Sequence, residues 1–412
     1  MDFNDTPEEA TYREEVRAWL QSNAEPLKPG ESAPTIEESD SDEIMREAQV
    51  WQAKKFDAGW ACLSWPKKFG GRAATGMQSI IWNQEERRFR VPPDVFQCGV
   101  GMVGPTLMAH GTEKQLEQWL PAIARGEDIF CQLFSEPTAG SDLSAVRTRA
   151  VRDGDDWIVD GHKIWTSLAQ YARWGILVVR TDFDARKHVG LTYFIVDLST
   201  PGIEIHPIKQ ITGSETFNEV FLTDVRIPDT NRISAVGNGW KVTLTTLANE
   251  RGAIASAAAG KVSVSALIKL ASRLCDDEGS LIEQSGVKEK IAEFFMRSRG
   301  LRYTSLRTLS AVSRGKKAGS EGSIGKLSAA TLRQEMSAFA IELQGLAGSM
   351  IDSDLGVTGG DWQEGYLFSP AARIAGGTDE IQRDIIAERA LGLPREPRVD
   401  KEMPFKDLPV GR

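Results

Sequence analysis

The stretch FCQLFSEPTAGSD, residues 130–142, decides how the rest of the chain is interpreted. An apolar run from Ile129 to Phe134 predicts a buried strand, which must stop where Glu136 meets Pro137. Pro137 lacks a backbone donor and forces Glu136 into an extended conformation, so we expect a turn in which Glu136 is structural and not catalytic. The small and hydroxylated residues that follow let backbone N–H groups approach a bound molecule and supply rotatable donors. We interpret this segment as a cofactor-facing loop, with an ordinary strand exit as the alternative.

The hydrophobic period differs on the two sides of this loop. From 129 to about 230, short alternating or apolar runs are separated by Asp-Gly and Pro-Gly breakers, which is typical of strands. No helix-length segment lies between them to serve as a crossover, so we predict a small antiparallel β domain. Helical spacing returns after Trp240, and the predicted segments there are helices at about 241–275, 286–315, 325–349 and 378–391, and a loop at 352–365.

The residues before the loop carry helix signals. Thr6, Pro7 and Glu9 predict a capped helix over 6–23. Further helices are predicted at about 42–58, 75–89 and 104–124, and a Pro-rich and acidic surface excursion at 24–40. Residues 99–104 fit G-x-G-x-x-G, but VPPDVF stands where a dinucleotide site requires a buried strand. We therefore interpret these glycines as sites of close helix packing.

The fold class that follows is mainly α with a β insert. We predict an N-terminal helical domain at 1–128, a middle antiparallel β domain at 129–235 and a C-terminal helical bundle at 236–395. The tail at 396–412 is polar, and we expect it to fray.

Composition excludes several classes of function. A net charge of −9 and a pI near 5.3 argue against nucleic-acid binding, which needs clustered cations. The four cysteines are far apart, so we expect reduced and buried thiols and no metal site; they are Cys62, Cys98, Cys131 and Cys275. The acidic N-terminus lacks a signal pattern, and no apolar run reaches the roughly 20 residues of a membrane span. We expect a soluble, cytoplasmic protein.

Four motifs, in this order, resemble those of the acyl-CoA dehydrogenase family over nearly the whole chain. They are LFSEPTAGSD (133–142), GHKIWTS (161–167), FNEVFLTDVRIP (217–228) and GGTDEIQRDIIAERALGLPR (376–395). The resemblance implies FAD bound at a subunit interface and α,β-dehydrogenation of an acyl-CoA to the trans-2-enoyl-CoA, as in the beta-oxidation of fatty acids or other lipids. It also implies electron transfer to an electron-transferring flavoprotein and a homo-tetramer or homodimer, with a mixed tetramer left open.

The resemblance also implies site residues. Trp165 and Ser167 match positions beside the flavin ring, although Trp165 could be a core aromatic residue instead. Thr378 could also serve as a helix N-cap. Ser141 matches a CoA contact as well as a flavin contact. The positions that match cofactor-binding residues are Gln132, Phe134, Ser135, Gly140, Ser141, Trp165, Ser167, Gln344, Gly345, Thr378 and Glu380.

The reaction needs a carboxylate beside the substrate Cα and donors around the thioester oxygen. In many family members the base directly precedes Gly-Thr of the last motif, where this chain has Gly376, which can offer only its backbone N–H to the substrate. The isovaleryl and long-chain branches carry the glutamate on an earlier helix, and Glu250-Arg251 match that arrangement. We predict Glu250 as the base, with its pKa raised by burial, while hydride passes to flavin N5 and Arg251 orients the substrate.

The helix around Glu250 supports this prediction independently. An apolar stripe is predicted there, with Arg251 inside it and Glu250 at its edge; its members are Trp240, Leu244, Leu247, Ile254 and Ala258. A charged pair on such a face is anomalous for core packing, because unpaired buried charge is costly. The alternative is a partly exposed acid with an arginine that extends outward.

Two other functions stay open. The same fold hosts flavin monooxygenases and oxidases, and Gly376 is compatible with a catalytically silent subunit of a mixed tetramer. The family's Arg-x-x-Phe-Gly segment is absent from 275–290, which leaves open how the adenine end of FAD is held.

Overall fold

The computed structural model describes residues 5–28, 31, 34, 41–257, 261–277, 279–313, 319, 321–351, 356–398, 400 and 402–408. The predicted excursion at 24–40 lies largely outside these residues. The chain forms two compact units, one comprising Met1–Ala253 with Glu396–Arg412 and the other Ile254–Arg395. Each is described by itself.

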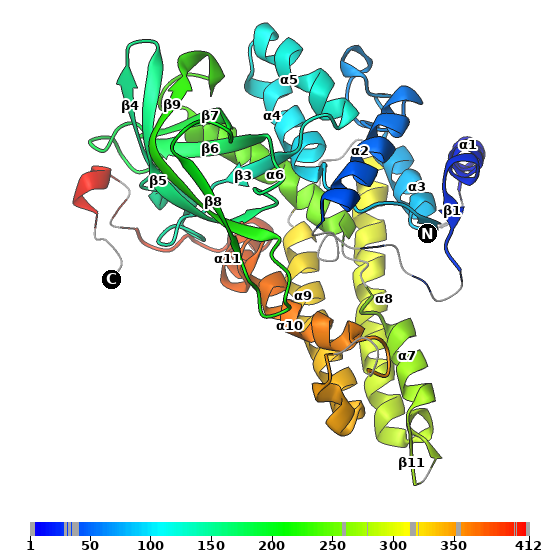
Figure 1. The fold of residues 1–412 in the computed structure, drawn as a ribbon. Helices are drawn as coiled ribbons and strands as arrows, with labels where there is room; N and C mark the ends of the chain where they lie inside the picture. Colours follow the sequence, from blue (N-terminus) through cyan, green and yellow to red (C-terminus); the bar gives the residue numbers. More distant parts are fainter. Residues whose placement is uncertain are drawn as a thin grey trace. The chain divides into compact units, whose positions relative to one another are not determined.

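The first unit begins with helices that the capping signals set (Figure 1). Thr6 and Glu9 form the predicted capping box, in which Thr6 Oγ1 accepts from the Glu9 backbone N–H at 3.3 Å. The single helix predicted at 104–124 is wrong, because Gly111 is extended and Thr112 caps a new helix with Gln115. The helices are α1 (Pro7–Asn23), α2 (Asp42–Asp57), α3 (Gly76–Glu86), α4 (Gly104–His110) and α5 (Glu113–Arg125).

The glycine motif lies in a π-helical turn, η3 (Gln97–Val103), and continues into α4. A Cβ added to Gly104 would lie 2.0 Å from the Trp65 ring, and one on Gly99 would lie 3.3 Å from Ile123. The prediction of close packing is therefore confirmed for Gly99 and Gly104, whereas a Cβ on Gly101 would approach only Gln97 of the same turn, at 3.8 Å.

The β domain is one twisted sheet in the order β10-β7-β6-β4-β5-β9-β8, with β3 paired to β6. Of the seven strand pairings described in this sheet, five are antiparallel, as predicted, and the pairings of β3 and β4 with β6 are parallel. Its strands are β3 (Phe130–Leu133), β4 (Arg149–Asp153), β5 (Asp156–Ser167), β6 (Trp174–Arg180), β7 (Leu191–Asp197), β8 (Ile203–Ile208), β9 (Phe217–Pro228) and β10 (Arg232–Ile233).

A wholly antiparallel sheet is nevertheless wrong, because β3 runs parallel to β6 from Phe130↔Trp174 to Leu133↔Leu177. The β4–β5 hairpin and its flanking loops carry the chain back between these two strands, so the crossover needs no helix. The middle strands are buried on both faces: Ile176 and Val178 face one core, and Leu177 and Val179 face another.

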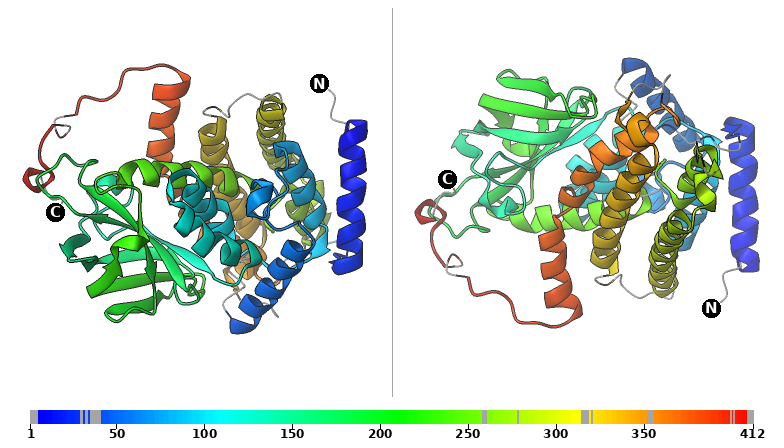
Figure 2. Two further views of the ribbon diagram at one scale, coloured as in Figure 1. Left: turned by 90° about the horizontal axis from the view of Figure 1, so that it is seen from above. Right: turned by 90° about the horizontal axis from the view of Figure 1, so that it is seen from below.

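In the second unit, α7, α8 and α9 lie side by side (Figures 1 and 2). Their shared core includes Leu267, Phe294 and Met336. The helix predicted at 241–275 is two helices, and residues 258–260 between them lie outside the described part. The helices are α6 (Gly239–Ala257), which continues from the first unit, α7 (Val264–Arg273), α8 (Ser285–Ser313), α9 (Glu321–Leu343), α10 (Asp361–Ile374) and α11 (Asp379–Ile385).

The predicted loop at 352–365 is wrong in its last five residues, because α10 begins at Asp361. Gly359 and Gly360 adopt positive φ angles and turn the chain into this helix. Gly365 and Pro370 conceal the helical pattern, yet a Cβ on Gly365 would lie 2.4 Å from the Val262 side chain, so packing requires glycine there.

The tail was expected to fray, and this is wrong for the described residues 402–408. Phe405, in the short helix η9 (Phe405–Asp407), is 1% exposed and belongs to the first unit. Figures 1 and 2 show this segment, in red, beside the strands. A polar segment with one well-placed aromatic side chain can dock even where its average composition suggests disorder.

The cysteines are free thiols, with Cys62 and Cys131 buried, Cys98 half-buried and Cys275 exposed, so the expectation that all are buried is wrong for Cys275. Among the described residues, no cluster of His, Cys, Asp or Glu could hold a metal ion. In the same part of the chain, no helix has the length and apolar character that a membrane crossing needs.

Candidate active site

The loop after β3 is fixed by Glu136. This residue and Ala139 exchange two backbone hydrogen bonds of 3.1 and 3.0 Å, which close a tight turn. The buried Glu136 carboxylate accepts from the backbone N–H groups of Arg147 and Thr148 at 2.6 and 2.9 Å and from Thr148 Oγ1 at 2.6 Å. A carboxylate with so many donors is a structural anchor, as predicted from its position before Pro137.

The partner of Glu136 is Lys163, a residue that sequence reasoning missed. Its ammonium group is fully buried and donates to Glu136 Oε1 at 2.8 Å, to the Phe134 carbonyl at 3.1 Å and to the Val178 carbonyl at 2.8 Å. Burial by itself would raise the pKa of Glu136, but Lys163 and the hydrogen bonds outweigh it and hold that pKa below its usual value. Lys163 therefore joins β3, β5 and β6 beneath the loop.

The tip of the loop faces outward. Gly140 and Ser141 are exposed, Gln132 and Ser135 are half-buried, and Phe134 packs edge-on against Tyr193 with ring centroids 5.9 Å apart. A Cβ on Gly140 would meet no atom within 4 Å, so packing within this chain does not require glycine there. The tip is free to approach a bound molecule.

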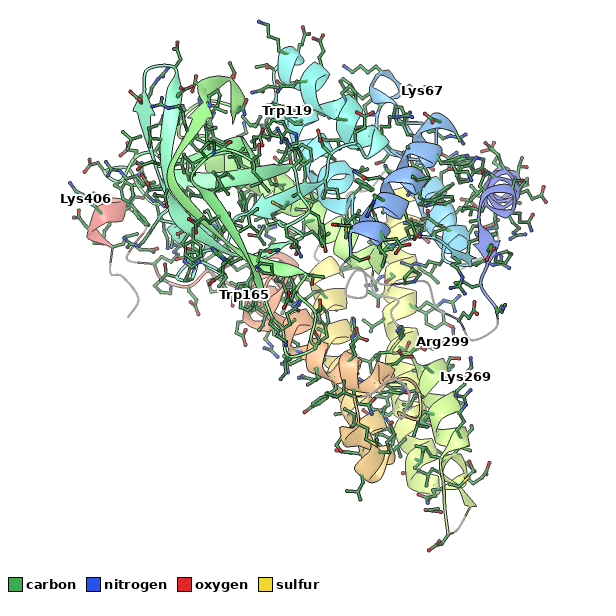
Figure 3. The ribbon with its side chains drawn as sticks, viewed as in Figure 1. Lys67, Trp119, Trp165, Lys269, Arg299 and Lys406 are labelled. Atoms are coloured by element: carbon green, nitrogen blue, oxygen red, sulfur yellow. The ribbon has the colours of Figure 1, made fainter. Side chains whose placement is uncertain are left out.

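The end of β5 presents an aromatic side chain in a strained backbone (Figure 3). Trp165 has φ +60° and is 57% exposed, and the β5–β9 register shifts between Lys163 and Thr166. Bulges and such φ values concentrate where a side chain must be re-aimed for function. The alternative of a core aromatic residue is therefore wrong for Trp165.

Two exposed side chains suit a flat, polar-edged ring at this place. The Thr166 hydroxyl is buried without a hydrogen-bond partner, and Ser167 beside it is exposed. The exposed indole of Trp165 and the exposed Ser167 offer an aromatic face and a hydroxyl to a bound ring, whereas the Thr166 hydroxyl is fully buried.

Helix α6 buries the predicted apolar stripe only in part, because Trp240 and Leu247 pack against a core cluster of the first unit whereas Leu244 does not. Leu244, expected in an apolar stripe, is 45% exposed, whereas Thr243 and Thr246 are fully buried. Their hydroxyls donate to the carbonyls of Gly239 and Val242 at 2.8 and 3.2 Å, which makes burial tolerable. The side chains of Ile254, Ala258 and Arg251, which the stripe also included, lie outside the described part.

Thr246 anchors this helix. Its Oγ1 lies 3.0 Å from Thr106 Oγ1 of α4 and 3.1 Å from the Tyr193 hydroxyl of β7. In addition, His110 Nε2 and Thr245 Oγ1 are 2.8 Å apart. The β domain and the N-terminal helices thus fix α6 in place.

Glu250 follows Thr246 by one turn and Thr243 by two, so it continues the buried threonine face. The side chain is half-buried. Burial, and then the negative charge of Glu250, raise the pKa of Cys98 to about 12. Glu250 is thus a carboxylate at the edge of a core and electrostatically close to Cys98.

The remaining predicted residues that the structure describes belong to the second unit. Gln344 is buried and donates to the Ala340 carbonyl at 3.0 Å, and Gly345 after it has φ +55°. Gly376 also has positive φ, +66°, and its carbonyl accepts from Gln382 Nε2 at 3.0 Å. Thr378 caps α11 by accepting from the Ile381 backbone N–H at 3.4 Å, as the alternative predicted, and Glu380 is exposed.

The chain matches three parts of one family in the expected order. These are the acyl-CoA dehydrogenase N-terminal domain over residues 6–127, the middle domain over 131–225 and the C-terminal domain over 237–391. It is 36% identical over 392 residues to the acyl-CoA dehydrogenase IpdE1 of Mycobacterium tuberculosis, covering 93% of this chain and 98% of that protein.

Solved structures agree with this assignment. The Tcur3481-Tcur3483 steroid ACAD superposes with a TM-score of 0.78 at 27% identity, covering 96% of this chain and all of that chain. The ChsE4-ChsE5 complex from Mycobacterium tuberculosis gives 0.77 at 29% identity, with 96% and 100% covered. Members of the family are flavoproteins that bind FAD. With its three family domains in order and a fold shared over nearly its full length, this chain belongs to the acyl-CoA dehydrogenase family and is a flavin-dependent oxidoreductase.

Proposed function

We propose that this protein dehydrogenates an acyl-CoA thioester between Cα and Cβ to give the trans-2-enoyl-CoA, with Glu250 as the base. The observation that carries the proposal is the place of Glu250 on the buried face of α6, one turn beyond the Thr246 anchor. Gly376 stands in the position where many relatives carry the base, and glycine has no side chain that could accept a proton. Glu250 takes the role of that base and removes the proton from the substrate Cα.

The chain offers a consistent set of residues for FAD, which when bound supplies the acceptor for the hydride from Cβ. In the first unit these are Gln132, Phe134, Ser135, Gly140, Ser141, Trp165 and Ser167. In the second unit they are Gln344, Gly345, Thr378 and Glu380. The strained backbone and exposed indole of Trp165 support this assignment most directly.

The substrate is held by three further groups in this proposal. The backbone N–H of Gly376 donates to the thioester carbonyl, where negative charge develops as the proton leaves. Ser141 binds the CoA portion, and Arg251 orients the thioester. Positive φ angles at Gly376 and Gly377 support a backbone shaped for such a role.

For the acyl group we propose a bulky, ring-bearing structure. One structural neighbour is titled a steroid ACAD, and another relative, 32% identical over half of this chain, is a cyclohexane-1-carbonyl-CoA dehydrogenase of Syntrophus aciditrophicus. For the assembly we propose a homo-tetramer or homodimer, with electrons passed to an electron-transferring flavoprotein. A mixed tetramer is the alternative, because the Tcur3481-Tcur3483 and ChsE4-ChsE5 structures are each titled with two chain names.

The test is anaerobic bleaching of the flavin by acyl-CoA thioesters without NAD(P)H. Glu250→Gln should keep FAD but lose bleaching by about 10² to 10⁴-fold, which is the usual contribution of a positioned base. Glu117→Gln, which neutralises an exposed acid of α5, is the matched control and should bleach normally. Normal bleaching by Glu250→Gln would refute the assignment.

A panel of straight, branched and ring-bearing thioesters, used in the same assay, tests the acyl group. A requirement for NAD(P)H and oxygen would instead favour a monooxygenase. Absence of turnover by the purified chain, restored by a second family member, would favour the silent subunit of a mixed tetramer.

A further inference from the structure

The C-terminal strap, defined as the described residues among 400–408, docks onto the loop between β6 and β7. The Phe405 backbone N–H donates to the Ala185 carbonyl at 2.9 Å, and that of Lys406 donates to the Phe183 carbonyl at 3.0 Å. Lys406, labelled in Figure 3, also pairs with Asp184 at 2.6 Å. Main-chain bonds and ion pairs therefore hold the strap on the β domain.

Phe405 covers the guanidinium of Arg180. The guanidinium carbon lies 3.3 Å from the centroid of the phenyl ring, and both side chains are almost fully buried. Arg180 donates to the carbonyls of Ser144 at 2.7 Å, Val146 at 3.1 Å and Lys187 at 3.1 Å. Two of these carbonyls directly follow the cofactor-facing loop, so Phe405 supports the arginine that holds the end of that loop.

A second connection runs through Lys187. This buried lysine pairs with Asp142, the last residue of the cofactor-facing loop, and lies 3.6 Å from Asp400 Oδ2 of the strap. The other carboxylate oxygen of Asp142 accepts from Ser144 Oγ at 2.8 Å. Asp400 is itself held by Arg398 at 2.9 Å. Strap and loop thus share one lysine.

The cofactor-facing loop depends on such support, because the residues at its tip are exposed and have little packing of their own. Gly140 and Ser141 are exposed, and a Cβ on Gly140 would meet nothing within 4 Å. We propose that the C-terminal strap is a positioning element of the flavin site, which acts through Arg180 and Lys187 to hold Gly140–Asp142 ready for the nucleotide. This inference rests on the proposed role of that loop in binding FAD.

The strap predicts a separation between cofactor affinity and catalysis. In the full-length protein, Phe405→Ala should weaken FAD binding roughly threefold to thirtyfold, the range found for residues that couple through a packed network. Asp400→Asn should act in the same direction and less strongly, because Asp142 keeps Lys187. With saturating FAD, kcat should stay near that of the native enzyme, since neither residue touches Glu250.

The measurement is the dissociation constant for FAD, taken from flavin fluorescence on titration of the apoprotein. Lys406→Gln removes only a surface ion pair of the strap and should leave the FAD dissociation constant unchanged. Leu20→Ala in α1 supplies a destabilised reference, because its core cluster does not include the loop. Leu20→Ala should lower the Tm without weakening FAD binding.

Unchanged FAD affinity in both Phe405→Ala and Asp400→Asn would overturn the proposal and leave the strap a stabilising element only. If Phe405→Ala does not fold, Phe405→Leu and Asp400→Asn decide, because the first keeps an apolar side chain but loses the aromatic face over Arg180 and the second removes only a charge near Lys187. Both should still weaken FAD binding. If the strap variants leave FAD affinity unchanged while Glu250→Gln still abolishes bleaching, the strap proposal fails and the proposed function stays intact. A native chain that binds no FAD would overturn both.

Discussion

Glu136 and Glu250 are two carboxylates of the same unit that differ in burial, because Glu136 is buried and Glu250 is half-buried. Glu136 lies in the most recognisable motif of the chain, where two backbone N–H groups, a hydroxyl and Lys163 all donate to it. Glu250 lies on a helix with no conspicuous motif, next to a half-buried thiol and a threonine face. The donors around Glu136 hold its negative charge in place, whereas the carboxylate of Glu250 lies at the edge of a core.

The difference shows how scaffold and chemistry are divided. Donors directed at a carboxylate favour its ionised form, so Glu136 cannot take up a proton near neutral pH. A general base works best when its proton affinity suits the reaction, and a carboxylate that several donors already hold ionised, as in Glu136, is poorly suited to that role. The conspicuous acid therefore builds the loop, and the inconspicuous one is the better candidate for proton transfer.

The strongest test of this contrast removes the partner of Glu136. Lys163→Met should lower the free energy of unfolding by about 3–5 kcal/mol, because Glu136 would remain as an uncompensated buried charge. Urea unfolding measures this. Glu250→Gln should change the same quantity by less than about 1 kcal/mol, because the substitution keeps the shape of a half-buried side chain.

The double variant Glu136→Gln/Lys163→Met serves as the control, because it removes both charges and should recover much of the loss. Equal destabilisation by Lys163→Met and Glu250→Gln would contradict the division between scaffold and chemistry.

Thr246 offers a test from the other side of the comparison. Thr246→Val should cost about 1–3 kcal/mol, because the Thr106 and Tyr193 hydroxyls would each lose a buried partner. Turnover should fall as well, since Glu250 follows by one turn, whereas FAD should stay bound. Denaturation and flavin spectra measure the two effects. Loss of FAD with unchanged turnover would show that α6 serves the cofactor and not the base.

How much of this could be predicted from sequence depends on the range of the interaction. The capping box at Thr6 and the turn at Pro137 are local, so neighbouring residues were enough to predict them. The parallel pairing of β3 with β6 was not predictable from strand patterns, because a hairpin replaces the expected crossover helix.

The candidate site divides in the same way. Glu250 could be proposed from the chemistry and from Gly376, but its face was predicted for the wrong reason. The apolar stripe was wrong at Leu244, because buried threonines satisfy their hydroxyls through the carbonyls four residues earlier, which hydrophobic periodicity does not register. Lys163 and Phe405 were missed because their partners, Glu136 and Arg180, are 27 and over 200 residues away.

Trp165 sharpens the comparison with a smaller effect. Trp165→Gly should stabilise the FAD-free protein by up to about 1 kcal/mol, because glycine adopts φ +60° without strain. FAD affinity should fall, since the exposed indole would be lost. Thermal unfolding of the apoprotein and FAD titration measure the two quantities. If the apoprotein is stabilised and its FAD affinity is undiminished, the assignment of Trp165 to the FAD site is contradicted.

The smallest effect concerns acid. The folded-state pKa of Glu136 is below its unfolded value of about 4.3, so its contribution to stability is complete above that pH and is lost as the pH falls through the lower folded value. Between pH 6 and pH 3, the urea midpoint of the native protein should therefore fall more steeply than that of Glu136→Gln/Lys163→Met. Parallel curves for the native protein and the double variant would mean that Glu136 gains no net proton-linked stability from Lys163, and the anchoring role assigned to that pair would then rest on its hydrogen bonds alone.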